Sequence, residues 1–194
     1  MRRAGLSLVL CVFLACDGAR EPPGAAGGST SPRPTATQVQ QRSAERPRPK
    51  LQNEALGPSR RRVRRAVRDL KKVRVWHRLT RGLYIVQLQT DPGAGGVPED
   101  GHLADARRDA VIDEEGSGSL CSVRIYPGAI KRELETLRQG YDRGVFGPPP
   151  SLRVLWATVL AHELAHCRRW NAGEPYAAKW EERVRRRLER LRVE

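Results

Sequence analysis

The chain has 194 residues, of which 39% are hydrophobic and only 5% aromatic. This supply of apolar side chains suits one compact domain and excludes a large, multi-domain core. The formal net charge is +14, and residues 42–81 alone carry 15 Lys and Arg against three Asp and Glu. The rest of the chain is close to neutral, so the basicity belongs to one segment and not to the whole fold.

The first sixteen residues have the pattern of an export signal. Arg2 and Arg3 precede an apolar run, LSLVLCVFLA, which is too short to span a bilayer as a helix. The run ends in FLAC, which resembles the cleavage site of a bacterial lipoprotein signal. The resemblance implies a signal peptide over 1–16, a lipid on Cys16, and an exported protein of the bacterial cell envelope, anchored to a membrane and facing the periplasm. The alternatives are an ordinary cleaved signal, an uncleaved anchor, or a segment that is not a signal.

Residues 17–57 are rich in Gly, Pro, Ala, Ser, Thr and Gln and contain few large apolar side chains. The burial available to such a segment cannot offset the entropy lost on ordering it, so we expect a disordered tether. The tether would connect the lipid to a folded domain over 58–194.

The folded part is expected to begin with a basic amphipathic helix over 58–75. Ser59 is the expected N-cap, and apolar residues recur at helical spacing: Val63, Ala66, Val67, Leu70 and Val73. The basic segment 42–81 suits contact with anionic lipid, an anionic cell-wall polymer or nucleic acid, or it is a solvated surface. Because only Trp76 lies nearby for base stacking, no specific nucleic-acid partner is expected.

The middle of the chain predicts a small sheet and a helix. Residues 82–90 form the first strand, and a Gly- and Pro-rich loop follows. Residues 107–126 predict two strands around a Gly-Ser turn, a hairpin that ends near Tyr126. Residues 127–141 predict a helix that starts with Pro.

Two helices are expected to close the chain. Ser151 follows a proline run and caps a helix over about 152–169. A final helix over about 175–192 has Arg and Glu on its outer faces and one apolar stripe, formed by Trp180, Val184, Leu188 and Leu191. The order of helices and strands predicts an α+β domain.

The sequence VLAHELAHC contains the pattern His-Glu-x-x-His. His162 and His166 are four residues apart, so on a helix both imidazoles leave the same face at a spacing that can hold one Zn²⁺. Glu163 follows the first ligand, where a carboxylate can take a proton from an attacking water and pass it to a leaving amine. The alternative is a structural histidine pair on a buried helix.

With these residues the sequence resembles a zincin-type metallopeptidase, and more closely the small bacterial and phage proteins with an HExxHC motif. The resemblance covers roughly residues 100–180, and the matching features are Cys121, HELAHC (162–167), Trp170 and the dipeptide EP (174–175). It implies a small zincin-like domain with a short antiparallel sheet, an edge strand along a cleft, zinc at the cleft floor and hydrolysis of peptide bonds. The chain departs from these relatives at Glu174, where they often carry His.

A catalytic zinc with one open position needs a third protein ligand. Glu174 is our leading candidate, because zincins with a Glu ligand take it from the helix after the motif helix, often with a small residue three positions later. Ala177 stands at that position. Glu181 and Glu182 are the alternatives.

Other polar residues have less specific signals. His102 and His77 are remote candidates for the metal, and a lone loop histidine is usually solvated. A stabiliser for the developing oxyanion is also expected, and Tyr176 or Tyr141 could serve. Nothing in the sequence chooses between these two tyrosines.

Four cysteines divide between the signal and the domain. Cys11 and Cys16 lie in the signal, so only Cys121 and Cys167 remain in the folded part. In an oxidising compartment they could form a disulfide, or they could be two small buried side chains.

The sequence therefore predicts a zinc-dependent peptidase of the cell envelope that acts on a peptide or protein. Zn²⁺ would be held by His162, His166 and Glu174, with Glu163 as the general base. The rival hypothesis is a non-catalytic zincin-fold protein that uses segment 42–81 to bind an anionic component of the envelope. A purely structural zinc site has no need of Glu163, which favours the enzyme.

Overall fold

The computed structural model describes residues 48–91, 102–113 and 116–191. The predicted signal, Cys16 and the tether as far as residue 47 lie outside these ranges, as does the Gly- and Pro-rich loop. Among the described helices, none combines the length and the apolar character needed to cross a membrane.

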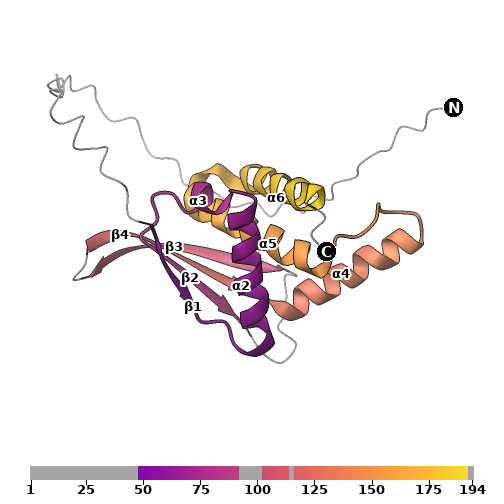
Figure 1. The fold of residues 1–194 in the computed structure, drawn as a ribbon, viewed down its shortest axis with the longest axis horizontal. Coiled ribbons are helices and arrows are strands. Elements are labelled where there is room, and N and C mark those ends of the chain that lie inside the picture. Colours follow the sequence, from indigo (N-terminus) through magenta and orange to yellow (C-terminus); the bar gives the residue numbers. More distant parts are fainter. Residues whose placement is uncertain (1–47, 92–101, 114–115, 192–194) are drawn as a thin grey trace, which may run out of the picture. The chain divides into compact units, whose positions relative to one another are not determined.

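The described chain has a first strand and two helices, then the remaining strands, then the C-terminal helices (Figure 1). In order they are β1 (Lys50–Asn53), α2 (Gly57–Lys72), α3 (Trp76–Leu79), β2 (Ile85–Thr90), β3 (Ala104–Asp113), β4 (Gly116–Ile125), α4 (Pro127–Asp142), α5 (Leu152–Arg168), the short 3-10 helix η1 (Trp170–Ala172) and α6 (Gly173–Arg190). The mixture of helices and one sheet agrees with the predicted α+β class. The hairpin and the three long helices of the C-terminal half lie close to their predicted ranges.

The domain begins earlier than the sequence predicts. Strand β1 lies inside 17–57, the range assigned to the tether, and it pairs with β2. Helix α2 begins at Gly57 with Leu56 in the N-cap position, and no side chain caps it. The prediction of Ser59 as the N-cap was therefore wrong, because Pro58 already occupies the first turn.

The sheet is mixed, whereas the resemblance implied an antiparallel one. Its strand order is β1-β2-β4-β3, with parallel pairing of β1 with β2 and of β2 with β4. Among the strands of the described residues, only β3 and β4 pair antiparallel. The strands of a hairpin adjoin in the sequence, whereas parallel neighbours are separated by a helix or another strand and have no local signal.

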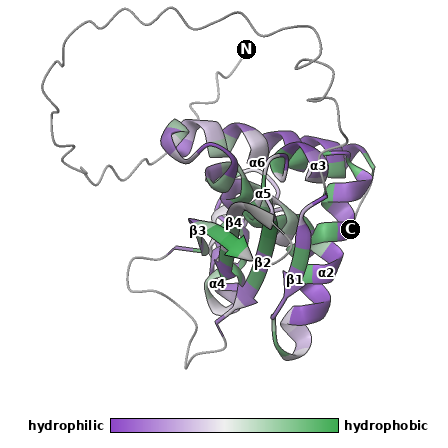
Figure 2. Ribbon diagram, turned by 90° about the vertical axis from the view of Figure 1, so that its left-hand side faces the viewer, coloured by the Kyte–Doolittle hydropathy of each residue, from purple (hydrophilic) through white to green (hydrophobic). Residues whose placement is uncertain are grey.

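The two faces of the sheet differ in polarity. On β2 and β4 the buried side chains of one face include Val86, Leu88 and Val123. The opposite face carries Gln87 and Ser122, which hydrogen-bond to each other. This alternation on β2 is visible in Figure 2. The apolar face of the sheet packs against the helices and forms the hydrophobic core with them.

Helix α5 is the central element of the core. It packs against α2, α6, β3 and β4, and its buried side chains occur all round the helix. An apolar surface on every side is what a helix enclosed by neighbours requires. Ser151 caps α5 as predicted, with its hydroxyl oxygen accepting from the Val154 amide at 3.3 Å. Leu191, predicted to join the stripe of α6, is exposed just beyond the helix end.

A buried ion pair joins α2 to α5. Asp69 is almost fully buried and accepts from Nε and from a terminal nitrogen of Arg153, at 2.8 and 2.7 Å. Asp69 holds the pKa of the Arg153 guanidinium above its usual value. Such a two-pronged pair fixes the angle at which the helices meet as well as their separation.

Cys121 and Cys167 form a disulfide, one of the two states that the sequence left open. The bond connects β4 to the end of α5, one residue after His166. It therefore attaches the helix that carries the His-Glu-x-x-His pattern to the middle of the sheet.

Candidate metal centre

The two histidines of the pattern leave α5 on one side and point to the same place. Their Nε2 atoms are 3.2 Å apart, and both rings are only partly exposed. Leu160 and Leu164, on the same helix, are fully buried and hold α5 against the core. The one-turn spacing thus produces the juxtaposition expected from the sequence.

Glu174 reaches the histidines because the chain reverses between α5 and α6. Gly173 has a φ of 65°, a conformation that a side chain disfavours, and Glu174 follows in the first turn of α6. Its carboxylate oxygens lie 3.0 Å from Nε2 of His162 and 3.2 Å from Nε2 of His166. Its side chain is 77% exposed, so this carboxylate is at the solvent side of the group.

His162, His166 and Glu174 could together hold a metal ion. One ligand atom from each lies within 4.8 Å of the others. The separations of 3.0–3.2 Å are close to the roughly 3.3 Å between ligands bound tetrahedrally at about 2 Å. The two Nε2 atoms and the carboxylate present lone pairs to the same place, and a proton or a shared cation there would relieve their mutual repulsion.

The two alternative ligands have different positions. Glu181 lies 3.2 Å from Nδ1 of His162, the ring nitrogen that faces away from the group. Glu182 is turned to the surface, where it pairs with Arg185 and Arg186. Glu181 therefore accepts a hydrogen bond from the outer nitrogen of a ligand, a contact that fixes the orientation of a metal-binding imidazole.

Charge and burial shift the two imidazoles in opposite directions. Burial lowers the pKa of His162, but the hydrogen bond with Glu181 and the charge of Glu163 outweigh it and the net direction is upward. For His166 burial dominates and lowers the pKa. Glu181 thus favours a protonated Nδ1 on His162, which leaves Nε2 as the atom that could coordinate a metal ion.

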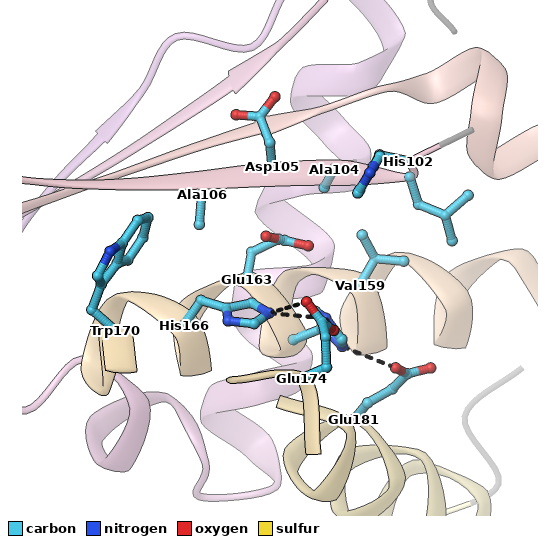
Figure 3. A pocket seen from close by; sticks show the side chains of 12 residues that line it. His102, Ala104, Asp105, Ala106, Val159, Glu163, His166, Trp170, Glu174 and Glu181 are labelled. Carbon is cyan, nitrogen blue, oxygen red and sulfur yellow. Dashed lines mark hydrogen bonds and ion pairs between the residues drawn. The ribbon is translucent and has the colours of Figure 1, made fainter. Parts of the chain in front are cut away.

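Glu163 occupies an environment that disfavours its charge. The residue is 8% exposed, although its side chain faces the cleft (Figure 3). Burial raises the pKa of its carboxyl to about 7, and neighbouring His162 only partly reverses this. A carboxyl group that changes protonation near neutral pH is suited to accept and return a proton.

The ligands and Glu163 lie in a cleft of about 440 Å³ between α5, α6 and β3. β3 is one of the two edge strands of the sheet, and it supplies one wall of the cleft through its first residues. Figure 3 shows Glu163 between His166 and this strand, with Trp170 at one end. Trp170 is 51% exposed, whereas the other three tryptophans are buried. The sequence marked Trp170 only through the resemblance, and it gave no sign that Ala104, Asp105 and Ala106 line the wall.

The remaining polar candidates divide between the cleft and the surface. His102 lines the cleft, whereas His77 is exposed on α3 away from it. Tyr176 packs edge-on against Trp180, and Tyr141 is half exposed on α4. Neither tyrosine lines the cleft, so the structure does not place either at the position expected of an oxyanion stabiliser.

Comparisons of the chain with protein family models, with curated proteins and with solved structures found no match. The functional assignment must therefore follow from the chemistry of the cleft.

Proposed function

We propose that this protein is a zinc-dependent peptidase. The observation that carries the proposal is Glu163, a buried carboxyl group in the same cleft as a three-residue group able to hold a metal ion. A structural metal site needs ligands but no additional proton acceptor beside them. The combination of ligands and base is what metal-assisted hydrolysis of a peptide bond requires.

The donor set favours zinc over the hard cations Ca²⁺ and Mg²⁺. Two imidazole nitrogens and one carboxylate, from His162, His166 and Glu174, leave one position open in a tetrahedral site. Harder cations such as Ca²⁺ and Mg²⁺ prefer oxygen ligands only. Zinc bound there would supply a Lewis acid that polarises the substrate carbonyl and makes water a competent nucleophile at neutral pH.

The proton transfers of the reaction would be made by side chains of the protein. Glu163 would accept a proton from the attacking water and return it to the leaving amine as the peptide bond breaks. Its raised pKa suits both halves of this exchange. Glu181 would hold the ring of His162 in the coordinating orientation.

The wider proposal places this activity in the cell envelope. The resemblance to a zincin, the export signal over 1–16 and a lipid on Cys16 support an exported, membrane-anchored peptidase that acts on peptides or proteins. The disulfide between Cys121 and Cys167 is compatible with an oxidising compartment such as the periplasm.

The proposal is tested by the zinc content and peptidase activity of the purified chain. We expect about one zinc per chain. His162→Ala and Glu174→Ala should lose the zinc, whereas Glu163→Gln should retain it and lose the release of peptides from an unfolded protein substrate by a factor of at least about 100. Far-UV circular dichroism would check that each variant is folded.

Two results would contradict this reading. A wild-type chain that takes up no zinc from a zinc-containing buffer would exclude the metal site. Zinc-loaded protein whose peptide release is unchanged in Glu163→Gln would exclude the assigned base and leave the rival hypothesis of a non-catalytic binding protein.

A further inference from the structure

The exposed side of α2 is almost purely cationic. The helix has eight Lys and Arg and one acid, Asp69. Asp69 is buried and its charge is taken up by Arg153. All eight basic side chains are exposed, so the surface of this helix presents positive charge without a compensating carboxylate of its own.

Four of these side chains form a stripe along the helix. Arg61, Arg65, Arg68 and Lys72 follow the spacing i, i+4, i+7, i+11, which places them on one face. That face lies opposite the buried one, which contains Val63, Val67 and Leu70. Within the part of the chain that the structure describes, none of the four makes an ion pair. We call these four residues the α2 stripe.

Helix α6 is also rich in arginine, but it contains several carboxylates that can pair with the basic side chains. It has six Lys and Arg and four Glu. Arg185 pairs with Glu182 and Glu189, and Arg186 pairs with Glu182. Like charges at i and i+4 destabilise a helix, and opposite charges at that spacing stabilise it. On α6 two of the arginines are therefore paired within the helix and four carboxylates offset most of its charge, whereas the α2 stripe retains its repulsion until an external anion relieves it.

We propose that the α2 stripe is a docking surface for an anionic lipid bilayer. A helix of this length presents its charges over roughly 24 Å in a nearly straight row, which suits a flat array of phosphate headgroups. α2 has no aromatic residue, so it lacks the side chains that stack on bases. This inference stands independently of the proposed peptidase activity.

Docking through α2 would leave the cleft accessible. α2 contacts β1 at one edge of the sheet, and the cleft uses β3 at the other edge. Three strand spacings, about 14 Å, separate these edges. Figure 2 shows α2 and β1 on one side of the domain and β3 on the other. A domain held by the α2 stripe would therefore turn its cleft away from the bilayer.

The test is co-sedimentation of the whole chain with lipid vesicles. One vesicle population is phosphatidylcholine, and the other is phosphatidylcholine mixed with phosphatidylglycerol. We expect tighter binding to the anionic vesicles, and this excess should disappear at high salt. Any apolar anchoring through residues 1–16 is common to both populations, so the difference between them isolates the electrostatic contribution.

Matched variants of α2 and α6 show which helix provides the electrostatic binding to the anionic vesicles. The first variant carries R61Q, R65Q, R68Q and K72Q, and we expect it to lose roughly fivefold in anionic-vesicle affinity per removed charge. The control carries K179Q, R183Q, R186Q and R190Q, which removes the same charge at the same spacing from α6. The control should retain most of the excess binding. If the fourfold α2 variant fails to fold, the pair R65Q and K72Q replaces it against K179Q and R186Q.

Three results would overturn the proposal. An equal loss in both variants would show that only net charge matters, and no preference for anionic vesicles would exclude a lipid surface. Binding of the wild-type chain to double-stranded DNA, as tight as to the vesicles and dependent on the same four residues, would assign the stripe to nucleic acid.

The orientation has its own readout in tryptophan fluorescence. Trp170 lies at the cleft and is exposed, whereas Trp76, Trp156 and Trp180 are buried. The emission of Trp170 is the difference in fluorescence between the wild type and Trp170→Phe. Vesicles with brominated acyl chains should not quench this emission, because Trp170 would face away from the bilayer. Quenching of Trp170 on binding would show that the cleft faces the bilayer.

Discussion

Glu163 illustrates at the scale of one residue how a functional group can oppose stability. Its carboxyl extends from α5 into the cleft, where burial raises the pKa to about 7 from 4.5. The folded chain thus binds this proton more tightly than the unfolded chain does. The contribution to stability is greatest below about pH 4.5 and is lost as the pH rises through 7.

We therefore expect Glu163→Gln to stabilise the metal-free protein at high pH. Above pH 7 the gain in the free energy of unfolding should approach about 3 kcal/mol, and it should vanish below about pH 4.5. Urea unfolding of chelator-treated wild type and variant at several pH values measures this difference in the free energy of unfolding. Glu135→Gln, on an exposed part of α4, is the control and should change little at any pH. A gain that does not depend on pH would contradict the burial argument.

Glu181 should matter for metal affinity without being a ligand. Because it holds Nδ1 of His162, we expect Glu181→Gln to weaken zinc binding by about 10- to 100-fold. Competition with a chelator of known affinity measures the change. Glu182→Gln removes the neighbouring carboxylate, which pairs only with arginines, and should leave the affinity unchanged. Equal effects of the two substitutions would point to net charge and remove the positioning role.

At the scale of an element, the start of α5 is held by its cap. Ser151→Ala should lower the free energy of unfolding by about 1 kcal/mol, because the Val154 amide loses its acceptor. Thermal or urea denaturation measures this loss. Ser59→Ala is the matched control, since Ser59 lies within the first turn of α2 and caps nothing. A comparable loss in Ser59→Ala would restore it as the cap.

Elements with local signals were the ones that sequence reasoning could predict. α5 has Ser151 and α4 has Pro127 at its start. The hairpin was predicted from its two strands, but the Gly-Ser run 116–119 that we expected at its turn is part of β4 and pairs with β3. Strand β1 has no such signal, because three of its four residues are polar. It forms by pairing with β2, which follows it in the chain only after α2 and α3. Pairing energy from a distant partner outweighs local propensity there.

At the scale of the molecule, the disulfide holds the site helix to the sheet. Cys121 and Cys167 are 46 residues apart, so removing the bond should cost about 4 kcal/mol through the entropy of the unfolded chain. Comparing urea unfolding of the wild type with a Cys121→Ala, Cys167→Ala variant measures this. Adding reductant should lower the stability of the wild type and leave that of the variant unchanged. A response of the variant to reductant would assign the effect to other cysteines.

The sequence by itself determined the parts of the site that one helix brings together. His162, Glu163 and His166 are placed by the turn of α5 alone, since four residues make just over one turn. It also indicated Glu174 as the leading third ligand, although it could not separate this residue from Glu181. Only the tertiary structure distinguished them, because the reversal at Gly173 sets which carboxylate faces Nε2 of His162 and which faces Nδ1.

The same division explains what else the sequence could not show. The mixed sheet, the Asp69–Arg153 pair and the Cys121–Cys167 bond all join residues that are far apart in the chain. Such contacts form because folding closes long loops and buries apolar surface at the same time, and no local pattern records the partner. The burial that raises the pKa of Glu163 has the same origin, for it depends on β3 closing over α5.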